Sequence, residues 1–329
     1  MPEAPEPGGG QGVTWSPDAE LDSYETFTIE LPDLPTYAGE QPGGLRATLI
    51  RRNPPRRRRA MLYIHGWDDY FFQRHLADEM YEAGYDFYAI DLHRYGRSLR
   101  EGQLAGFTHD LDDYFGELGR AAEIISGEGH DVLVVMGHST GGLIASLWVA
   151  ANPGIADAVV LNSPWLELQS YSAARPAIAS MLKAARQVAS TAVLSMADGG
   201  IYQRAISSAQ DGNWDYNPNL KGDHAFVVRV GWLWAVMAGH ARVASGLGID
   251  VPVFMAISAT SDFNRKWSEE LRTADVVLDV ERLATRAHRL GRHVTLVRVK
   301  GGMHDLTLSD EPARSDFFED LRRWLAAYG

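Results

Sequence analysis

The sequence predicts an α/β protein whose sheet is mostly parallel and is covered by helices on both faces. Short, almost wholly apolar runs recur along the chain, as they do in parallel strands that are buried on both sides. Longer, helix-compatible stretches separate these runs, which indicates strand–helix–strand crossover connections. Two earlier runs instead alternate apolar and polar residues, a pattern that is typical of half-exposed antiparallel strands.

These patterns predict a sheet of eight strands, of which the first two are antiparallel. In chain order the expected strands are 25–31, 46–52, 61–64, 86–90, 132–136, 158–161, 251–257 and 293–299. The helices expected beside them are 71–83, 111–125, 142–151, one before the last strand, and 315–328. The continuous apolar runs begin at residue 61, so we expect the parallel part of the sheet to begin there.

The regular alternation of expected strands and helices stops between residues 165 and 248. This segment holds helix-compatible stretches at 175–194 and 226–244 but no convincing buried strand. It is far longer than an ordinary connection between neighbouring elements. We therefore interpret it as a helical cap inserted after the sixth strand, between two parts of one core, 25–164 and 249–329.

The start of the chain predicts a flexible tail over residues 1–24. It reads MPEAPEPGGGQG, which is rich in Pro and Gly, and the first alternating run begins only at residue 25. The tail has neither the basic start nor the apolar stretch of a signal or transit peptide. No segment reaches the roughly 18 apolar residues of a membrane span. We therefore expect a cytoplasmic protein without stable membrane insertion.

The composition excludes several classes of function. Lys and Arg number 31 and Asp and Glu 43, so the net charge is −12. Such a charge repels nucleic acids and anionic membranes. The chain has no cysteine, which excludes disulfides, thiol nucleophiles and iron–sulfur clusters. The basic run RRNPPRRRR at 51–59 is interpreted as a solvated hairpin loop between two strands, with a patch at Arg56–Arg59 that binds an anion or a partner as the alternative.

The sequence GHSTG at 137–141 has the form G-x-S-x-G and lies between an expected strand and an expected helix. In that context the motif indicates a sharp turn that exposes a nucleophilic serine, here Ser139. The turn strains the backbone and tolerates no side chain at crowded neighbouring positions, which Gly137, Gly141 and Gly142 satisfy. The helix that follows points its free N–H groups at the serine.

A serine hydroxyl is a weak nucleophile, so it needs a base that is itself held by an acid. In such folds the histidine follows the last strand. The expected strand 293–299 is followed by KGGMHD, which makes His304 the candidate base. Gly301 and Gly302 give this loop the freedom to aim an imidazole.

The acid is expected after the strand 251–257, and four carboxylates are candidates. Asp262 is closest to the end of that strand, Asp275 lies where the chain re-enters a helix, and Asp279 follows shortly after. Glu167, after the preceding strand, is a more distant alternative. The residues alone leave this choice open.

Attack by serine creates an oxyanion that two N–H groups must stabilise. The first is expected from the backbone of Thr140, directly after the nucleophile. The second is expected from Trp67 in the His65-Gly66-Trp67 loop, where the glycine allows close approach. The Trp67 ring either forms a wall of the pocket or packs beneath the cap.

Four motifs together resemble the α/β-hydrolases of the monoacylglycerol lipase and lysophospholipase-like group, also described as serine aminopeptidase-like, over residues 25–329. They are HGW at 65–67, DLHRYGRS at 91–98, GHSTGG at 137–142 and the late His304. The resemblance implies an eight-stranded α/β-hydrolase fold with a helical cap after the sixth strand. In this group the acid begins a D-x-V-x-D segment about 30 residues before the histidine. The resemblance therefore favours Asp275, which lies 29 residues before His304.

The predicted activity is hydrolysis of a hydrophobic, small-molecule carboxylic ester through an acyl-enzyme, without cofactor or metal. Substrate contacts are expected from five residues: His65, Gly66, His138, Trp165 and Trp232. Further apolar side chains of the cap are Trp214, Tyr216, Trp234 and Met237, beside the amphipathic stretch 173–194. Such a lining suits an acyl chain or an aromatic group, although many of these rings also suit simple packing.

Other reactions on the same triad are alternatives: hydrolysis of amides, peptides or lactones, and cleavage of carbon–carbon bonds. A ligand-binding protein that keeps the fold without turnover is an alternative of another class. The cap is large, the acid loop is long and HGW lacks the extra glycine of many lipases. The sequence therefore predicts neither a particular acyl chain nor an oligomeric state.

Overall fold

The computed structural model describes residues 13–41, 43–52, 55–168, 175–194, 200–222 and 225–329. Among these described residues, nine strands form one sheet in the order β1-β2-β3-β5-β4-β6-β7-β8-β9. They are β1 (Ser16–Pro17), β2 (Tyr24–Leu31), β3 (Leu45–Arg52), β4 (Arg59–Ile64), β5 (Tyr85–Asp91), β6 (Val132–His138), β7 (Ala158–Asn162), β8 (Val253–Ser258) and β9 (Val294–Val299). The predicted α/β class is confirmed, and each of the eight expected strands is present.

The sheet is antiparallel at one end and parallel over the rest. β1, β2, β3 and β5 pair antiparallel, and every pair from β5 through β4 to β9 is parallel. All side chains of β5, β7 and β8 are buried, as their continuous apolar runs predict. The carboxyl ends of the parallel strands therefore lie along one edge of the sheet, where side chains from several strands meet.

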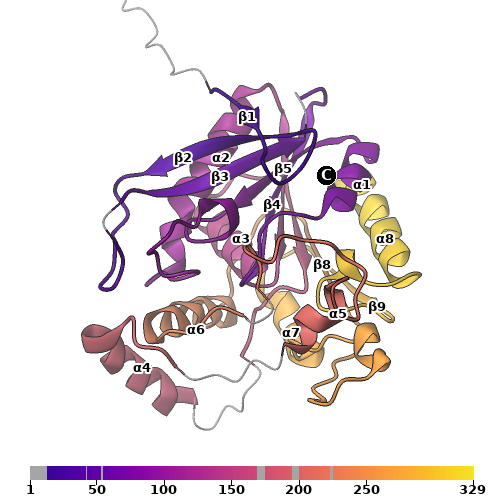
Figure 1. The fold of residues 1–329 in the computed structure, drawn as a ribbon. Coiled ribbons are helices and arrows are strands. Elements are labelled where there is room, and N and C mark those ends of the chain that lie inside the picture. Colours follow the sequence, from indigo (N-terminus) through magenta and orange to yellow (C-terminus); the bar gives the residue numbers. More distant parts are fainter. Residues whose placement is uncertain (1–12, 42, 53–54, 169–174, 195–199, 223–224) are drawn as a thin grey trace, which may run out of the picture.

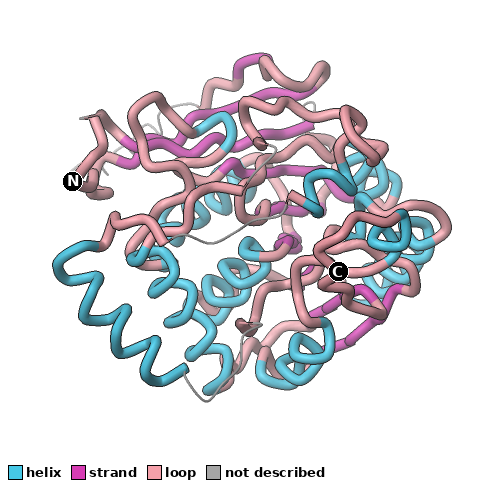
Figure 2. Tube along the Cα trace, turned by 60° about the horizontal axis from the view of Figure 1, so that its bottom comes forward, coloured by secondary structure: helices cyan, strands magenta, loops and turns pink. Residues whose placement is uncertain are grey.

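The helices cover both faces of the sheet (Figure 2). They are α1 (Arg74–Glu82), α2 (Phe115–Gly127), α3 (Thr140–Ala151), α4 (Arg175–Ala189), α5 (Ile201–Ile206), α6 (Val230–Ser245), α7 (Val280–Arg286) and α8 (Ala313–Tyr328). The side chains of β4 alternate between two cores. Leu62 and Ile64 pack with α2 and α3, whereas Met61 and Tyr63 pack with α1 and α8. This period of two is what a strand between two helical layers requires.

The segment between β7 and β8 contributes no strand to the sheet within its described residues, and it carries α4, α5 and α6 (Figure 1). α4 and α6 pack side by side below the sheet in that view. α6 also belongs to the main core, because Trp232, Val236 and Val243 join the apolar cluster of α2 and α3. The part of the expected amphipathic stretch at 173–174 lies outside the described residues.

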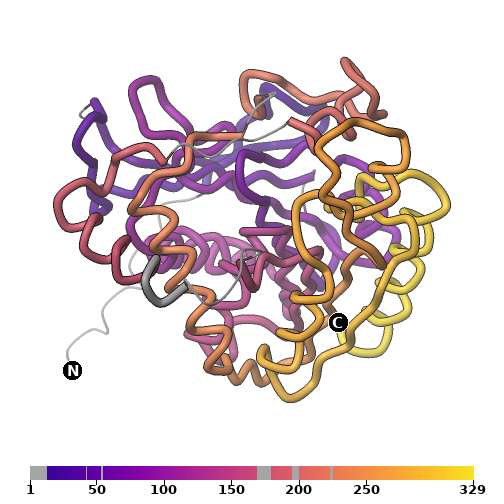
Figure 3. Tube along the Cα trace, turned by 90° about the horizontal axis from the view of Figure 1, so that it is seen from below, coloured from indigo at the N-terminus to yellow at the C-terminus, as the bar shows by residue number. Residues whose placement is uncertain are grey.

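Residues 13–24 correct the predicted tail, because they pack against the sheet. β1 pairs with β2 and adds a ninth strand to the expected eight. The Trp15 indole donates to Glu128 at 2.7 Å, and Leu21 and Tyr24 are buried. These anchors are spaced irregularly, so no alternation marks them in the sequence. Residues 1–12 lie outside the described part of the chain. Figure 3 shows the indigo N-terminal strands and the yellow C-terminal helix on different sides of the molecule.

The basic run is not a hairpin, and only its middle part is a loop, because Arg51 and Arg52 end β3 and Arg59 begins β4. Arg51 is buried and forms ion pairs with Glu25 and Glu128. β3 and β4 are not neighbours, since β5 lies between them in the sheet. The described residues 56–59 are exposed, and the backbone N–H groups of Arg56 and Arg57 donate to Asp86 at 2.6 and 2.7 Å. The Arg57 guanidinium lies over the Tyr81 ring at 4.6 Å. The run is therefore tied to the body of the protein, and residues 53–54 lie outside the description.

Candidate active site

The turn after β6 holds Ser139 in a strained conformation, with φ 52° and ψ −117°. Non-glycine residues seldom adopt a positive φ. A Cβ on Gly137 would lie 2.5 Å from the Gly141 carbonyl oxygen, and one on Gly141 would clash with the carbonyl oxygens of His65 and Ile64. The glycines therefore permit the close backbone packing that presents Ser139 at the edge of the sheet.

Three predicted residues from distant parts of the chain meet at this edge. Ser139 Oγ lies 3.0 Å from His304 Nε2, and His304 Nδ1 lies 3.0 Å from Asp275 Oδ2. The exposed fractions are 7% for Ser139, 3% for His304 and 0% for Asp275. A hydroxyl, an imidazole and a carboxylate in this chain of hydrogen bonds can pass a proton from the serine and stabilise the imidazolium that forms.

Asp275 is held by its own loop. Its Oδ1 accepts the backbone N–H groups of Val277 and Leu278 at 2.8 and 2.7 Å, which leaves Oδ2 facing His304. Its backbone pairs with that of Ser261 in a short parallel bridge. The chain therefore leaves the end of β8, forms a long loop, and returns beside its starting point.

The other candidate acids have partners elsewhere. Asp262 caps a turn by accepting the Asn264 N–H at 2.8 Å. Asp279 caps α7 by accepting the Arg282 N–H at 3.2 Å. Glu167 accepts from the Arg286 guanidinium at 2.6 Å. Among the four candidates, the hydrogen bonds of the described residues join only Asp275 to His304.

A network that the sequence analysis missed fixes the loop of His304. The buried Asp305 accepts the Asn162 amide at 2.7 Å, and the Thr307 backbone and hydroxyl at 2.9 and 2.7 Å. Burial alone raises the pKa of Asp305, but the nearby His138 and the hydrogen bonds from Thr307 and Asn162 outweigh it, so the pKa lies below its usual value. The signal in the sequence was the carboxylate directly after His304.

His138 contacts the candidate base. Its ring centroid lies 4.9 Å from that of His304, and its Nδ1 lies 3.2 Å from the Asn162 carbonyl oxygen. Burial lowers the pKa of His138.

The two predicted oxyanion donors belong to residues that line the same cavity as Ser139. Thr140 is the first residue of α3, and Trp67 follows the close contact between Gly66 and Ser139. Neither backbone N–H donates to another residue in the described ranges. His65 fixes the loop, because its Nε2 accepts the Leu92 N–H at 3.1 Å and its Nδ1 lies 2.8 Å from the Gly66 carbonyl oxygen.

An apolar cavity of about 330 Å³ opens beside Ser139. Its lining is Trp67, Ser139, Thr140, Trp165, Leu168, Val228, Trp232, Leu233, Val277 and Leu278. Two of the predicted substrate contacts, Trp165 and Trp232, belong to this lining. The Trp67 ring both forms part of the wall and packs at 3.6 Å between centroids against Trp232.

The other three predicted substrate contacts, His65, Gly66 and His138, lie outside the cavity lining. They shape the loops around Ser139 and His304 instead. Their positions in the sequence, next to the motifs, do not show whether a side chain supports the loop or contacts a ligand.

The remaining apolar side chains of the expected cap lie in two separate clusters. Trp214 and Tyr216 pack with Tyr70 and Phe72, and Trp234 and Met237 pack between α4 and α6. The Trp214 indole donates to the Leu308 carbonyl oxygen at 2.7 Å. Trp214 and Tyr216 therefore pack the inserted segment onto the core, whereas Trp234 and Met237 pack its helices against each other.

A second feature that the sequence analysis missed links the inserted segment to the loop of Trp67. Lys221 Nζ lies 2.9 Å from Asp69 Oδ1, and both side chains are almost fully buried. Burial alone lowers the pKa of Lys221, but the carboxylates of Asp69 and Asp68 outweigh it, so the pKa is raised. The ring of Tyr202 lies nearby, edge-on to His304 at 5.3 Å between centroids.

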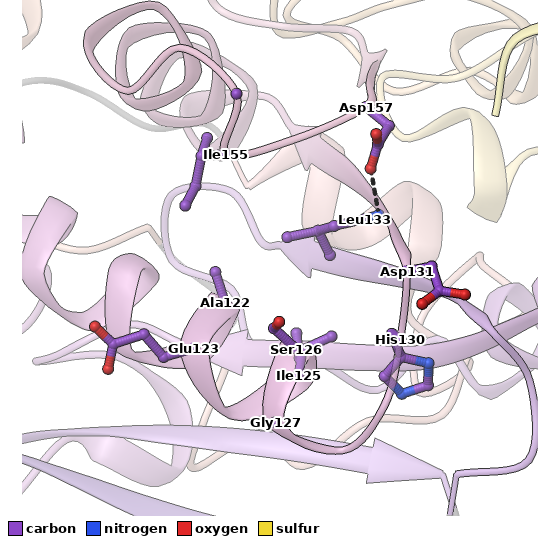
Figure 4. Close-up of a pocket in the computed structure, with 11 residues that line it drawn as sticks. Ala122, Glu123, Ile125, Ser126, Gly127, His130, Asp131, Leu133, Ile155 and Asp157 are labelled. Atoms are coloured by element: carbon purple, nitrogen blue, oxygen red, sulfur yellow. Dashed lines mark hydrogen bonds between the residues drawn. The ribbon is translucent and has the colours of Figure 1, made fainter.

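A larger hollow of about 640 Å³ lies at the other end of β6 (Figure 4). It is lined by residues such as Ser126, His130 and Asp157, and the hydrogen bond drawn there joins the Leu133 N–H to Asp157. No nucleophile bonded to a base is found among its lining residues. The cavity beside Ser139 is therefore the candidate active site because of the side chains that line it, although the other hollow has the larger volume.

Within the described ranges, no group of three or more His, Asp or Glu side chains is arranged to hold a metal ion. No helix in the same ranges is both long enough and apolar enough to cross a bilayer.

The fold and the strand–turn–helix around Ser139 define an α/β-hydrolase. The family model described as serine aminopeptidase, S33, matches residues 55–311. The chain belongs to this family, so the α/β-hydrolase of the serine aminopeptidase-like group that the sequence motifs predict is confirmed. No curated protein matches the sequence.

Several solved structures share the fold at low sequence identity. The monoacylglycerol lipase of Paleococcus ferrophilus is 17% identical, with a TM-score of 0.62, covering 82% of this chain and 94% of that one. A soluble variant of monoglyceride lipase from Saccharomyces cerevisiae, in complex with a substrate analog, is 16% identical, with a TM-score of 0.62, covering 99% of both chains. A thermostable carboxyl esterase from Bacillus coagulans is 14% identical, with a TM-score of 0.60, covering 92% of this chain and 98% of that one.

Proposed function

We propose that this chain is a serine hydrolase that cleaves hydrophobic carboxylic esters by transfer of the acyl group to water. The observation that carries the proposal is the pair of 3.0 Å contacts that join Ser139 to His304 and His304 to Asp275. The strained turn at Ser139 and the apolar cavity beside it support the same conclusion.

The geometry suits a two-step reaction. Ser139 Oγ attacks the ester carbonyl carbon while His304 Nε2 takes its proton. The backbone N–H groups of Trp67 and Thr140 stabilise the oxyanion that forms. The intermediate collapses, and the alcohol leaves with the proton from His304. Water then attacks the acyl-enzyme with His304 as base, which releases the acid and regenerates Ser139. Asp275 orients the imidazole and stabilises its charged form.

An uncharged substrate fits the cavity better than a peptide with a free amino terminus. None of the ten lining residues carries a charged side chain. An aminopeptidase must hold the ammonium group of its substrate, which calls for a carboxylate or a set of carbonyl acceptors. The lining instead offers tryptophan, leucine and valine side chains, which bind by removing apolar surface from water.

Ser139→Ala tests the mechanism. The variant should lose hydrolysis of short p-nitrophenyl esters and lose labelling by a fluorophosphonate, which phosphonylates a nucleophilic serine with release of fluoride. Ser146→Ala is the matched control, because Ser146 is a buried serine of α3 whose hydroxyl donates only to the Gly142 carbonyl oxygen, at 2.7 Å. That control should keep both activities. Turnover retained by Ser139→Ala, with the fold intact by circular dichroism, would exclude the proposal.

A panel of substrates separates the alternatives. Short esters, long-chain monoacylglycerols, lactones and aminoacyl amides are compared on the same preparation. Faster turnover of the esters supports the proposal, and faster turnover of amides or lactones would replace the ester in it. Absence of both turnover and labelling would favour a binding protein. The cytoplasmic location and the role of the inserted segment as a cap remain predictions.

A further inference from the structure

The loop that carries Trp67 is held by a buried lysine of the inserted segment. Lys221 Nζ donates to the Asp69 carboxylate at 2.9 Å and to the Asp68 carbonyl oxygen at 3.3 Å. All three side chains are almost fully buried. A lysine is seldom buried so completely unless it is paired. The ammonium group of Lys221 therefore ties down two consecutive residues of the loop, directly after Trp67.

The same loop is anchored to the core at its beginning and at its end. His65 bonds to the core before the bend, and the Phe71 N–H donates to Asp91 at 2.9 Å after it. Asp68 lies between these anchors and has φ 49°. A residue other than glycine keeps such a conformation only where its surroundings hold it there. Lys221 supplies such a hold, because it bonds the Asp68 carbonyl oxygen from outside the loop.

We infer that Lys221 is a positioning residue for the reaction, which acts through the backbone of Asp68 and Asp69 to keep the N–H of Trp67 where the oxyanion forms. The inference rests on the proposed ester hydrolysis. An oxyanion donor is effective because its direction is fixed before the reaction, so a loop that can shift loses part of that effect. Through Lys221 the inserted segment would supply part of the catalytic geometry.

The segment around Lys221 is docked by contacts that do not use its ammonium group. The Lys221 N–H donates to the Asn217 carbonyl oxygen at 3.1 Å, and the Asn217 N–H donates to the Tyr70 hydroxyl at 2.7 Å. The Asn217 side-chain amide also donates to Glu20 at 2.9 Å. Removal of the ammonium group should therefore loosen the loop of Trp67 without releasing the inserted segment.

Three variants separate positioning from stability. Lys221→Met removes both hydrogen bonds to the loop. The double variant Lys221→Met, Asp69→Leu removes them too, but it also removes the carboxylate that would be left without its cation. Both should lower kcat on a p-nitrophenyl ester by about 10- to 100-fold, since misplacing a catalytic group by about 1 Å can cost about 100-fold. Their KM should stay within about 3-fold of native, because the apolar lining is unchanged. Asp69→Asn keeps an oxygen acceptor for the ammonium group and should retain kcat within about 3-fold.

Arg51→Met is the matched control. Arg51 is a buried cation of β3 that pairs with Glu25 and Glu128 at 2.7 and 2.5 Å. Among the described residues its guanidinium bonds to these two carboxylates and not to the loop of Trp67. This variant should be less stable than the native protein but should keep its kcat. Fluorophosphonate labelling counts the intact sites in each preparation, so that kcat is expressed per folded molecule.

An inhibitor that forms an oxyanion reports on the same geometry without turnover. Ser139 Oγ adds to the carbonyl carbon of octyl trifluoromethyl ketone, His304 takes the proton, and the former carbonyl oxygen becomes an oxyanion that the Trp67 and Thr140 N–H groups hold. Octyl methyl ketone has the same chain but resists addition, so it reports apolar binding alone. Lys221→Met should raise the inhibition constant of the trifluoromethyl ketone by about the factor by which kcat/KM falls. The inhibition constant of the methyl ketone should stay within about 3-fold.

The outcomes separate this inference from the proposed function. Native kcat per labelled site in Lys221→Met or in the double variant, or equal increases in both inhibition constants, would overturn the inference, because the ion pair would then serve stability alone. An equally large fall in kcat with Arg51→Met or Asp69→Asn would overturn it as well. If Lys221→Met does not fold, the double variant decides, since it retains neither of the paired charges. Loss of all hydrolysis in the native protein, with no labelling of Ser139, would instead overturn the proposed function.

Discussion

The backbone N–H of Asp262 donates to the carbonyl oxygen of Asp275 at 3.0 Å, so two candidate acids lie side by side at the end of β8. Only one of them faces the imidazole. Asp275 is fully buried with Oδ2 against His304, whereas Asp262 uses its carboxylate in a local turn with Asn264. Proximity to the strand end therefore does not identify the acid, but the direction of the carboxylate does.

This relationship gives a sharp mutational test. Asp275→Asn should lower kcat on a p-nitrophenyl ester by about 10³- to 10⁴-fold, because an amide cannot stabilise the imidazolium and favours the wrong tautomer. Asp262→Asn should change kcat by less than about 3-fold, since an asparagine can still accept in the same turn. Steady-state kinetics on both variants decides the point, and the reverse pattern would move the acid to Asp262.

The sequence predicted the parts of the site that local rules determine. G-x-S-x-G between a strand and a helix locates Ser139, because only glycines permit the backbone packing that the turn needs. His304 followed from chain order after the last strand. The α/β class followed from continuous apolar runs, which a strand buried on both faces requires.

The parts that sequence reasoning missed depend on contacts between distant segments. Lys221 is an ordinary surface residue by type, and nothing local indicates that it pairs with Asp69 inside the protein. Trp15 lies in a segment without periodicity, yet its indole reaches Glu128. The sequence also does not show which tryptophan side chains pack in the core and which line the cavity. Trp165 and Trp214 look alike in the sequence, but only Trp165 lines the cavity.

The buried ion pair between Lys221 and Asp69 should be important for stability. Lys221→Met leaves Asp69 without its cation, which should cost about 3–5 kcal/mol in the free energy of unfolding. The double variant Lys221→Met, Asp69→Leu should recover much of this loss, because the carboxylate that Lys221 pairs with is removed together with the cation. Urea denaturation of the three proteins measures the difference. A double variant as unstable as Lys221→Met alone would contradict the assignment.

The raised pKa of Lys221 also sets a pH dependence. A lysine whose pKa is higher in the folded protein than in the unfolded chain contributes stability below its unfolded pKa of about 10.4. That contribution is lost as the pH rises through the folded pKa. The native protein should therefore lose stability above about pH 10 more steeply than the double variant, as measured by thermal unfolding across that range.

Asp305 should make the protein sensitive to acid. Its pKa is below the usual value in the folded state, so its contribution is present above the unfolded pKa of about 3.9 and is lost as the pH falls through the folded pKa. Asp305→Asn should be less stable at pH 7 and should lose less stability between pH 5 and pH 2 than the native protein. Denaturant melts at several pH values measure both slopes, and parallel slopes would contradict the prediction.

The glycines of the turn should tolerate no side chain, in contrast to a glycine with open space around it such as Gly119. A Cβ at Gly141 would clash with the backbone carbonyl oxygens of His65 and Ile64, which belong to β4 and the loop after it. Gly141→Ala should therefore displace the loop that carries Trp67, and so reduce kcat on a p-nitrophenyl ester by at least about 100-fold, the effect of losing one oxyanion donor.

Gly119→Ala is the control, because Gly119 lies within α2 with no atom within 4 Å of an added Cβ. That change should leave kcat unaltered and raise the unfolding free energy by about 0.5–1 kcal/mol, the gain of alanine over glycine in a helix. Normal turnover in Gly141→Ala would mean that the turn can relax around an added methyl group without moving the oxyanion donors.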